Sequence, residues 1–148
     1  MIRIRLEHAE RGRKAEREFQ QWLDRSGVPY LYATQDIESV PAYYQGRIKR
    51  PDYLVGLPYM ATVAFDVKSK STYGGAYLFD VPEIRRLAHF ADLFQISTFF
   101  ACLDPEGGPS SRWLRVAELM ELDPEKRARK EVIAAPIAMG IPVDMSGR

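Results

Sequence analysis

The stretch from residue 50 to residue 70, RPDYLVGLPYMATVAFDVKSK, constrains the fold more than any other part of the chain. It reads as two short strands joined by a turn that contains glycine and proline. The apolar residues of the second strand occupy alternate positions: Val63, Phe65 and Val67. Because successive side chains of a strand point to opposite faces, Asp66 and Lys68 share the other face, roughly 6.5 to 7 Å apart along the strand. One face of this strand is therefore expected to join the core, while the other carries charge.

Pairing of the two strands brings a second acid, Asp52, alongside Asp66. Two neighbouring carboxylates repel each other unless a cation lies between them, and a divalent metal ion is the usual solution. A lysine beside such a pair can hold or activate a water molecule, and the metal polarises a phosphoryl oxygen. The stretch therefore predicts phosphodiester hydrolysis. The alternative interpretation is an edge hairpin whose charges are simply solvated.

The spacing of Pro51-Asp52 and Asp66-Val67-Lys68 resembles the signature of the PD-(D/E)XK nuclease superfamily. The resemblance implies an α/β fold of the restriction-endonuclease type, in which helices flank a mixed central β-sheet. It also implies that Asp52, Asp66 and the backbone carbonyl of Val67 bind Mg²⁺ or Mn²⁺. Lys68 would then orient or deprotonate the attacking water. The implied reaction is hydrolysis of a nucleic-acid phosphodiester, leaving a 5′-phosphate and a 3′-hydroxyl.

A helix is predicted over residues 7–26, where apolar residues recur at helical spacing and Gly27 provides a stop. Glu16 and Glu18 both flank its apolar stripe, and helical geometry does not choose between them. The resemblance favours Glu16, because the first helix of several such nucleases has a glycine followed four residues later by a glutamate, as Gly12 and Glu16 are here. Glu16 is therefore expected to support the metal as a further catalytic residue.

Basic residues near the motif are the expected contacts for nucleic-acid phosphates. They are Arg13, Lys14, Lys49, Arg50 and Lys70. Lysine and arginine total 21 and the acids total 20, so the chain has no overall basic field and any binding site must be a local patch. The alternative for each of these residues is an ordinary solvated charge.

The rest of the chain gives a coarser prediction. A strand is expected over 30–34. The segment 35–47 is ambiguous, with a possible short strand around Tyr43. A helix is expected from Asp80 to Ile96, with Asp80 as its cap and Glu83 completing a capping box. The further expected elements are a buried strand over 97–103, an edge strand over 113–116, a charged helix over 123–131 and an irregular tail from Val132.

Composition fits one domain over residues 1–148, with 46% hydrophobic residues. The nuclease resemblance covers about residues 7–103, which leaves 104–148 as a C-terminal extension. The single cysteine, Cys102, excludes an intramolecular disulfide and a cysteine cluster for zinc. No apolar run approaches the roughly 18 residues of a membrane span, and the N-terminus lacks a signal-peptide core, so a cytoplasmic protein without membrane contact is expected.

The sequence therefore predicts a metal-dependent nuclease with DNA as the expected substrate. The motif alone does not decide between DNA and RNA, or between endonuclease and exonuclease action. A homodimer is expected if the substrate is a duplex or a junction, because two cuts need two active sites. Two alternatives belong to other classes. One is a non-catalytic nucleic-acid-binding module on the same fold, and the other is an interaction or inhibitor protein with a chance motif.

Overall fold

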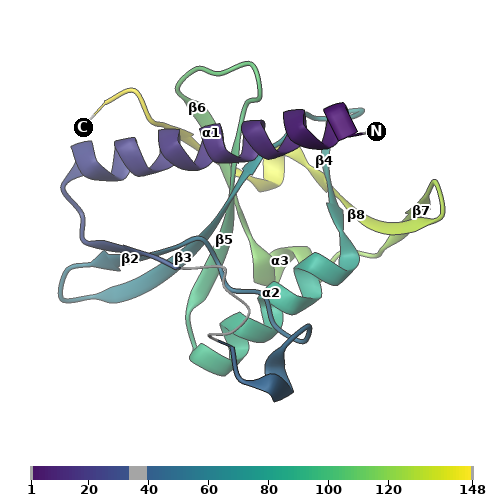
Figure 1. Cartoon of the computed structure of the whole chain (residues 1–148), viewed down its shortest axis with the longest axis horizontal. Helices are drawn as coiled ribbons and strands as arrows, with labels where there is room; N and C mark the ends of the chain where they lie inside the picture. Colours follow the sequence, from purple (N-terminus) through teal and green to yellow (C-terminus); the bar gives the residue numbers. More distant parts are fainter. Residues whose placement is uncertain (1, 34–39, 148) are drawn as a thin grey trace.

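A six-stranded mixed sheet forms the centre of the computed structural model, which describes residues 2–33 and 40–147 (Figure 1). The strand order is β1-β2-β3-β5-β6-β9, and only β3 and β5 are parallel neighbours within it. These strands are β1 Tyr30–Tyr32, β2 Tyr53–Leu57, β3 Ala61–Ser69, β5 Ser97–Leu103, β6 Ser110–Arg115 and β9 Ile141–Asp144. The mixed sheet between helices is the architecture that the sequence predicted.

A second, antiparallel sheet has the order β4-β8-β7. Its strands are β4 Ala76–Asp80, β8 Lys130–Pro136 and β7 Glu125–Arg127. Strand β4 leads directly into helix α2, Val81–Phe94, which connects back to β5. The crossover from β3 to the parallel β5 therefore includes both β4 and α2, and it carries α2 across the face of the sheet opposite α1 (Figure 1).

Helix α1, Ile2–Ser26, covers one face of the central sheet and ends at Gly27, whose φ of 71° suits glycine. Ala15, Phe19 and Leu23 recur at helical spacing and are buried against the sheet. Phe19 packs on Phe65 of β3 with ring centroids 5.3 Å apart. The apolar side of β3 predicted from its alternation is thus the side that α1 covers.

The opposite face packs against α2, the short helix α3 (Val116–Leu119) and the second sheet. Phe100 of β5 and Phe79 of β4 stack at 4.6 Å and have no exposed surface. Leu87 of α2 and Cys102 of β5 belong to the same buried cluster, so the cysteine packs as a small apolar residue. Asp66 and Lys68 of β3 point to this face, because their register partners are Phe100 and Cys102.

The strand expected around Tyr43 is wrong. Residues Ala42–Tyr44 form the 3-10 helix η2, which follows Pro41. Pro41 has no N–H to donate to a strand ladder, and Tyr43 instead stacks edge-on against Tyr44 at 5.0 Å. The rest of that prediction, together with the end of the strand expected over 30–34, falls on residues 34–39, which lie outside the described residues.

The charged helix expected over 123–131 is also wrong, because β7 and β8 form a hairpin there. A nine-residue helix without an apolar stripe is marginal in water. The strand instead delivers Val132, Ile133 and Ala135 to the core, and it pairs along its length with β4. The tail from Val132 is therefore built into both sheets through β8 and β9, with the 3-10 helix η3 Ile137–Met139 between them.

Strand β6 is longer than the edge strand expected over 113–116, and it is internal, because β5 and β9 pair with its two sides. The position at the edge belongs to β9. Within the described residues, no helix combines the length and the apolar character needed to cross a membrane.

Candidate active site

The two acids of the motif meet where β2 stops pairing with β3. The ladder is in register at Tyr53 and Phe65, and the Asp52 N–H still donates to the Phe65 carbonyl at 2.9 Å. Pro51 has no N–H to continue it. The next free N–H along β3, that of Val67, donates instead to Oδ2 of the Asp52 carboxylate at 2.8 Å. The end of the ladder thus holds the Asp52 side chain against β3.

Asp66 is 1% exposed, and its two oxygens have different environments. Oδ2 accepts a hydrogen bond from Lys49 Nζ at 3.0 Å and lies 3.5 Å from Lys68 Nζ. Oδ1 is buried and has no hydrogen-bond partner among the described residues. A buried anionic oxygen without a partner is costly, and a bound cation would satisfy it.

Asp52 adds a second electrostatic reason for a cation. Burial is the largest influence that raises the pKa of Asp52, and the charges of Asp66 and Glu16 raise it further. The hydrogen bond from the Val67 N–H lowers it, and the pKa that results is about 7. A divalent ion between the two carboxylates would remove this repulsion and offset the burial. The residues present therefore fit Mg²⁺ or Mn²⁺, which bind carboxylates and retain several waters.

The backbone of Val67 is oriented as the motif requires. In a strand, the N–H and C=O of one residue point to the same edge. Because the Val67 N–H faces Asp52, its carbonyl also faces the edge of β3 that β2 has left. This is the oxygen expected to add to the ligands from Asp52 and Asp66.

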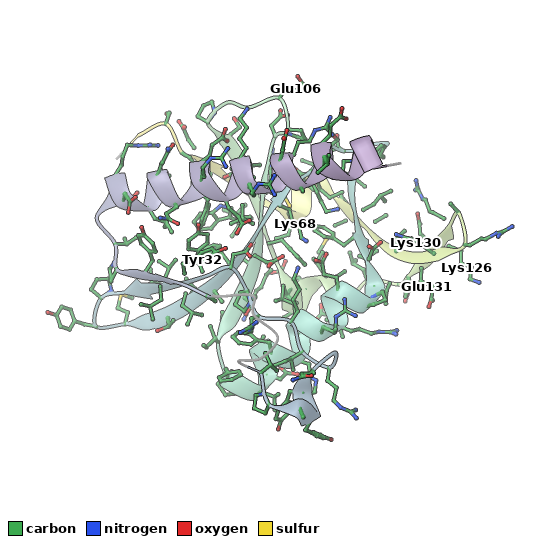
Figure 2. The ribbon with its side chains drawn as sticks, in the orientation of Figure 1. Tyr32, Lys68, Glu106, Lys126, Lys130 and Glu131 are labelled. Carbon is green, nitrogen blue, oxygen red and sulfur yellow. The ribbon has the colours of Figure 1, made fainter. Side chains whose placement is uncertain are left out.

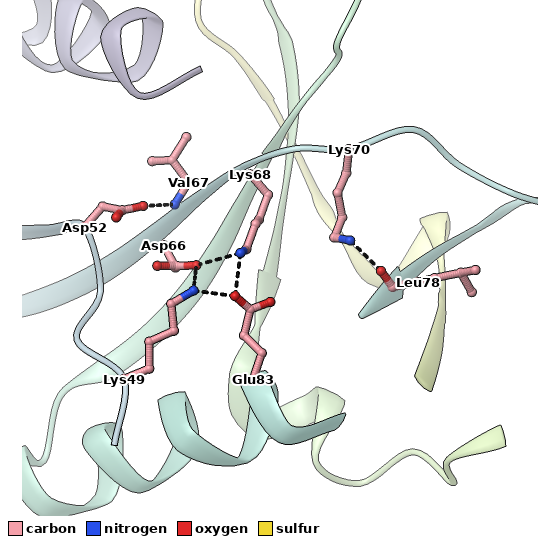
Figure 3. A network of polar contacts seen from close by, with 8 residues as sticks. All are labelled: Lys49, Asp52, Asp66, Val67, Lys68, Lys70, Leu78 and Glu83. Carbon is pink, nitrogen blue, oxygen red and sulfur yellow. Dashed lines mark hydrogen bonds and ion pairs between the residues drawn. The ribbon is translucent and has the colours of Figure 1, made fainter. Parts of the chain in front are cut away.

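A compact network of two lysines and two carboxylates lies on the α2 side of Asp66 (Figure 3). Lys68 Nζ donates to Oε2 of Glu83 at 2.5 Å, and Lys49 Nζ donates to the same oxygen. Both ammonium groups also lie against Asp66 Oδ2. Glu83 therefore orients the two lysines toward the acid of the motif from the first turn of α2.

Burial and charge act in opposite directions within this network. Burial alone would raise the pKa of Glu83, but the ammonium groups of Lys68 and Lys49 lower it to about 2. Burial would lower the pKa of Lys49, yet the carboxylates of Asp66 and Glu83 raise it above that of a free lysine. The side chains of both lysines are 25% exposed, so each ammonium lies at the boundary between the network and solvent.

Comparison with known proteins identifies the architecture. No protein-family model matches the chain, and no curated protein matches it in sequence. Among solved structures, Hjc of Archaeoglobus fulgidus, a Holliday junction resolvase, matches with a TM-score of 0.59 and 19% sequence identity. The match covers 88% of this chain and 94% of that one. The chain has the restriction-endonuclease-like fold. The PD-(D/E)XK resemblance is thereby confirmed at the level of fold.

Within this restriction-endonuclease-like fold, Glu16 lies on the α1 side of the sheet. Its Oε1 accepts a hydrogen bond from the Tyr32 hydroxyl at 3.3 Å, and its charge contributes to the raised pKa of Asp52. In the described part of the chain, no three side chains of His, Cys, Asp or Glu gather closely enough to hold a metal ion. Asp52 and Asp66 thus form the acidic pair, and Glu16 lies near its Asp52 end.

The five cations predicted to contact phosphates divide into different environments. Arg13 is exposed and lines a hollow of about 350 Å³ beside Glu16, whereas Lys14 is 3.9 Å from Glu18 on the same helix. Lys49 points into the network, and Arg50 is half-buried. Lys70 donates to the Leu78 carbonyl at 2.5 Å, and burial lowers its pKa.

Glu83 is the site residue that the sequence prediction assigned to another role. Asp80 does occupy the N-cap of α2, but its side chain makes no capping hydrogen bond, and the carboxylate of Glu83 turns to the lysines instead. The capping-box interpretation is therefore wrong. Glu83 lies in the first turn of the predicted helix that follows the motif along the chain, which was the only local signal for its role.

Proposed function

We propose that this protein is a metal-dependent nuclease that hydrolyses DNA phosphodiester bonds at Asp52 and Asp66. The observation that carries the proposal is the pairing of a buried carboxylate that has an unsatisfied oxygen, Asp66, with the half-buried carboxylate of Asp52, beside a lysine held by Glu83. The fold adds support, because PD-(D/E)XK folds typically use Mg²⁺ and the similar structure is that of a Holliday junction resolvase.

Asp52, Asp66 and the Val67 carbonyl would hold the ion, and Glu16 would hold a water bound to it. When bound, Mg²⁺ or Mn²⁺ polarises the phosphoryl group and makes water a better nucleophile. Lys68 orients the attacking water through an ammonium that Glu83 fixes in place. Lys49, which shares both carboxylates with Lys68, adds positive charge where the phosphoryl oxygens gain negative charge. The products are a 5′-phosphate and a 3′-hydroxyl.

A nuclease assay on single-stranded, duplex and branched DNA, with and without Mg²⁺ or Mn²⁺, tests the proposal. Wild-type protein should cut at least one substrate only when metal is present, and Asp66→Ala and Lys68→Ala should abolish cutting. Asp144→Ala is the matched control, because Asp144 is an exposed carboxylate on the edge strand β9. Failure of the wild type to cut any DNA or RNA in either metal would overturn the proposal.

A homodimer is part of the proposal if the substrate is a duplex or a junction. One chain supplies one acidic pair, and cuts in two strands need two. Light scattering on the purified protein measures its mass with and without DNA. A monomer that cuts both strands of a duplex would contradict this part.

One observation favours a second candidate, a DNA-binding module that does not cut. Asp66 Oδ2 and Lys68 already have partners in Lys49 and Glu83, so both groups are paired without a substrate. Tight binding of DNA without cutting in the same assay would identify this function.

A further inference from the structure

A groove of about 520 Å³ separates the first turn of α2 from the β7–β8 hairpin. Its lining residues are Asp80, Val81, Pro82, Glu83, Arg85, Arg86, Lys126, Arg129, Lys130 and Glu131. Glu83 belongs both to this groove and to the network around Asp66. The groove therefore begins where the proposed active site ends.

Five of the ten residues that line the groove are cations, and four of these five have no counter-ion among the described residues. Arg85, Arg86, Lys126 and Arg129 form no ion pair with any described residue. Two of the three acids along it are neutralised by lysines, since Glu83 pairs with Lys68 and Lys49, and Asp80 lies 3.7 Å from Lys130. The surface therefore presents a net positive charge to solvent, although the chain as a whole is nearly neutral.

The hairpin holds two of these cations away from the body of the molecule. It turns at Ala128 and Arg129, which both have positive φ, 49° and 71°. Figure 1 shows the hairpin projecting beyond α2, and Figure 2 shows Lys126 and Lys130 on it, with Lys68 toward the centre. Residues 126 to 131 are all exposed. A long polyanion that enters the active site can therefore continue along the groove to the hairpin.

We infer that this groove binds the sugar–phosphate backbone of duplex DNA on one side of the phosphate that is cut. The inference rests on the proposed nuclease function and specifies its substrate. Backbone phosphates are the ligand that a row of unpaired lysines and arginines fits. The ten lining residues include no aromatic side chain, whereas sites for single strands use aromatic rings to stack bases. The chemistry of the groove thus favours a duplex arm over a single strand.

The placement has a consequence for substrate length. The first turn of α2 lies between Lys68 and the β7–β8 hairpin. A duplex that ends close to the cut phosphate therefore cannot contact the hairpin. Lengthening the duplex arm on that side should lower KM until the arm reaches the hairpin, with kcat unchanged. Removing the hairpin cations should abolish this dependence on length.

The test measures duplex binding by fluorescence anisotropy in EDTA over a series of salt concentrations. Lys126→Ser/Arg129→Ser should lower the slope of log K against log salt by about two, and each lost contact should weaken binding by about tenfold at 0.1 M salt. Arg127→Ser is the matched control. It removes a positive charge from the same hairpin, but Arg127 does not line the groove, and its guanidinium is 2.7 Å from Glu125.

Arg85→Ser tests the groove independently of the hairpin, because Arg85 is an exposed residue of α2 that lines the other wall. It should lower the slope by about one. If wild-type protein binds and cuts DNA while both groove variants bind like Arg127→Ser, the groove inference is overturned and the nuclease function stands. If the wild type neither binds nor cuts any nucleic acid, both are overturned.

Discussion

Replacing Asp52 with asparagine should remove a large pH-dependent cost to the folded protein. Burial and the neighbouring charge of Asp66 raise the pKa of Asp52 from 3.8 to about 7. The unfolded chain therefore releases this proton at a lower pH than the folded chain does. The cost is absent below pH 3.8, grows as pH rises, and is complete above about pH 7. Asparagine does not ionise, and its side-chain carbonyl can still accept the Val67 N–H.

The size of the cost follows from the shift of about three pKa units. At 1.36 kcal/mol per unit, ionised Asp52 lowers the free energy of unfolding by roughly 4 kcal/mol once the pH exceeds its folded pKa. Between about pH 5 and pH 8 the wild type should lose roughly 3 kcal/mol through this group. A bound divalent ion should recover much of that loss at pH 8, because it binds the folded state in preference to the unfolded chain.

The measurement is urea unfolding of wild type and Asp52→Asn at both pH values, in EDTA and then in Mg²⁺. The variant should lack the loss of stability with pH, and it should also lack the stabilisation by Mg²⁺. Asp144→Asn is the control, because hydrogen bonds from Ser146 lower the pKa of Asp144, which is then ionised in both states across this range. Equal dependence on pH in wild type and Asp52→Asn would refute the proposed environment of the acidic pair.

Three further predictions concern single side chains. Lys68→Met should abolish cutting in Mg²⁺ but leave duplex affinity within about threefold by anisotropy, since the Lys68 ammonium is already paired with Asp66 and Glu83, unlike the unpaired cations of the groove; unchanged kcat would contradict the role of Lys68. Phe100→Ala should lower the free energy of unfolding by about 3 to 5 kcal/mol, because the ring is fully buried against Phe79; a loss below 1 kcal/mol in urea unfolding would contradict that packing. Ala128→Gly should raise thermal stability by up to about 1 kcal/mol, because glycine adopts the positive φ of that turn without strain; a lower melting temperature would argue against the turn.

The sequence predicted the central hairpin and the acidic pair because both depend on local patterns. Alternation along β3 fixed which side chains share a face, and the register of β2 and β3 then placed Asp52 next to Asp66. The long apolar periods of α1 and α2 and the buried run of β5 were equally local signals. Each of these elements contains its own apolar pattern, so no distant contact was needed to predict it.

The second sheet was missed because its strands are specified by distant partners. Strand β8 is stabilised by pairing with β4, more than fifty residues earlier, whereas its charged neighbours resemble an exposed helix. The role of Glu83 was not predicted for the same reason. Its spacing from Asp80 suits a capping box, but the lysines that it binds come from β3 and from the segment before β2. Local spacing does not indicate which distant charge a carboxylate will meet.

The most direct test is a crystal structure of the protein with Mn²⁺, using the anomalous signal of the metal. We expect a peak between the Asp52 and Asp66 carboxylates, about 2.0 to 2.3 Å from Asp66 Oδ1, and we expect Asp66→Ala to remove it. A Mn²⁺ peak elsewhere, or none at saturating metal, would show that this pair of acids is not a metal site.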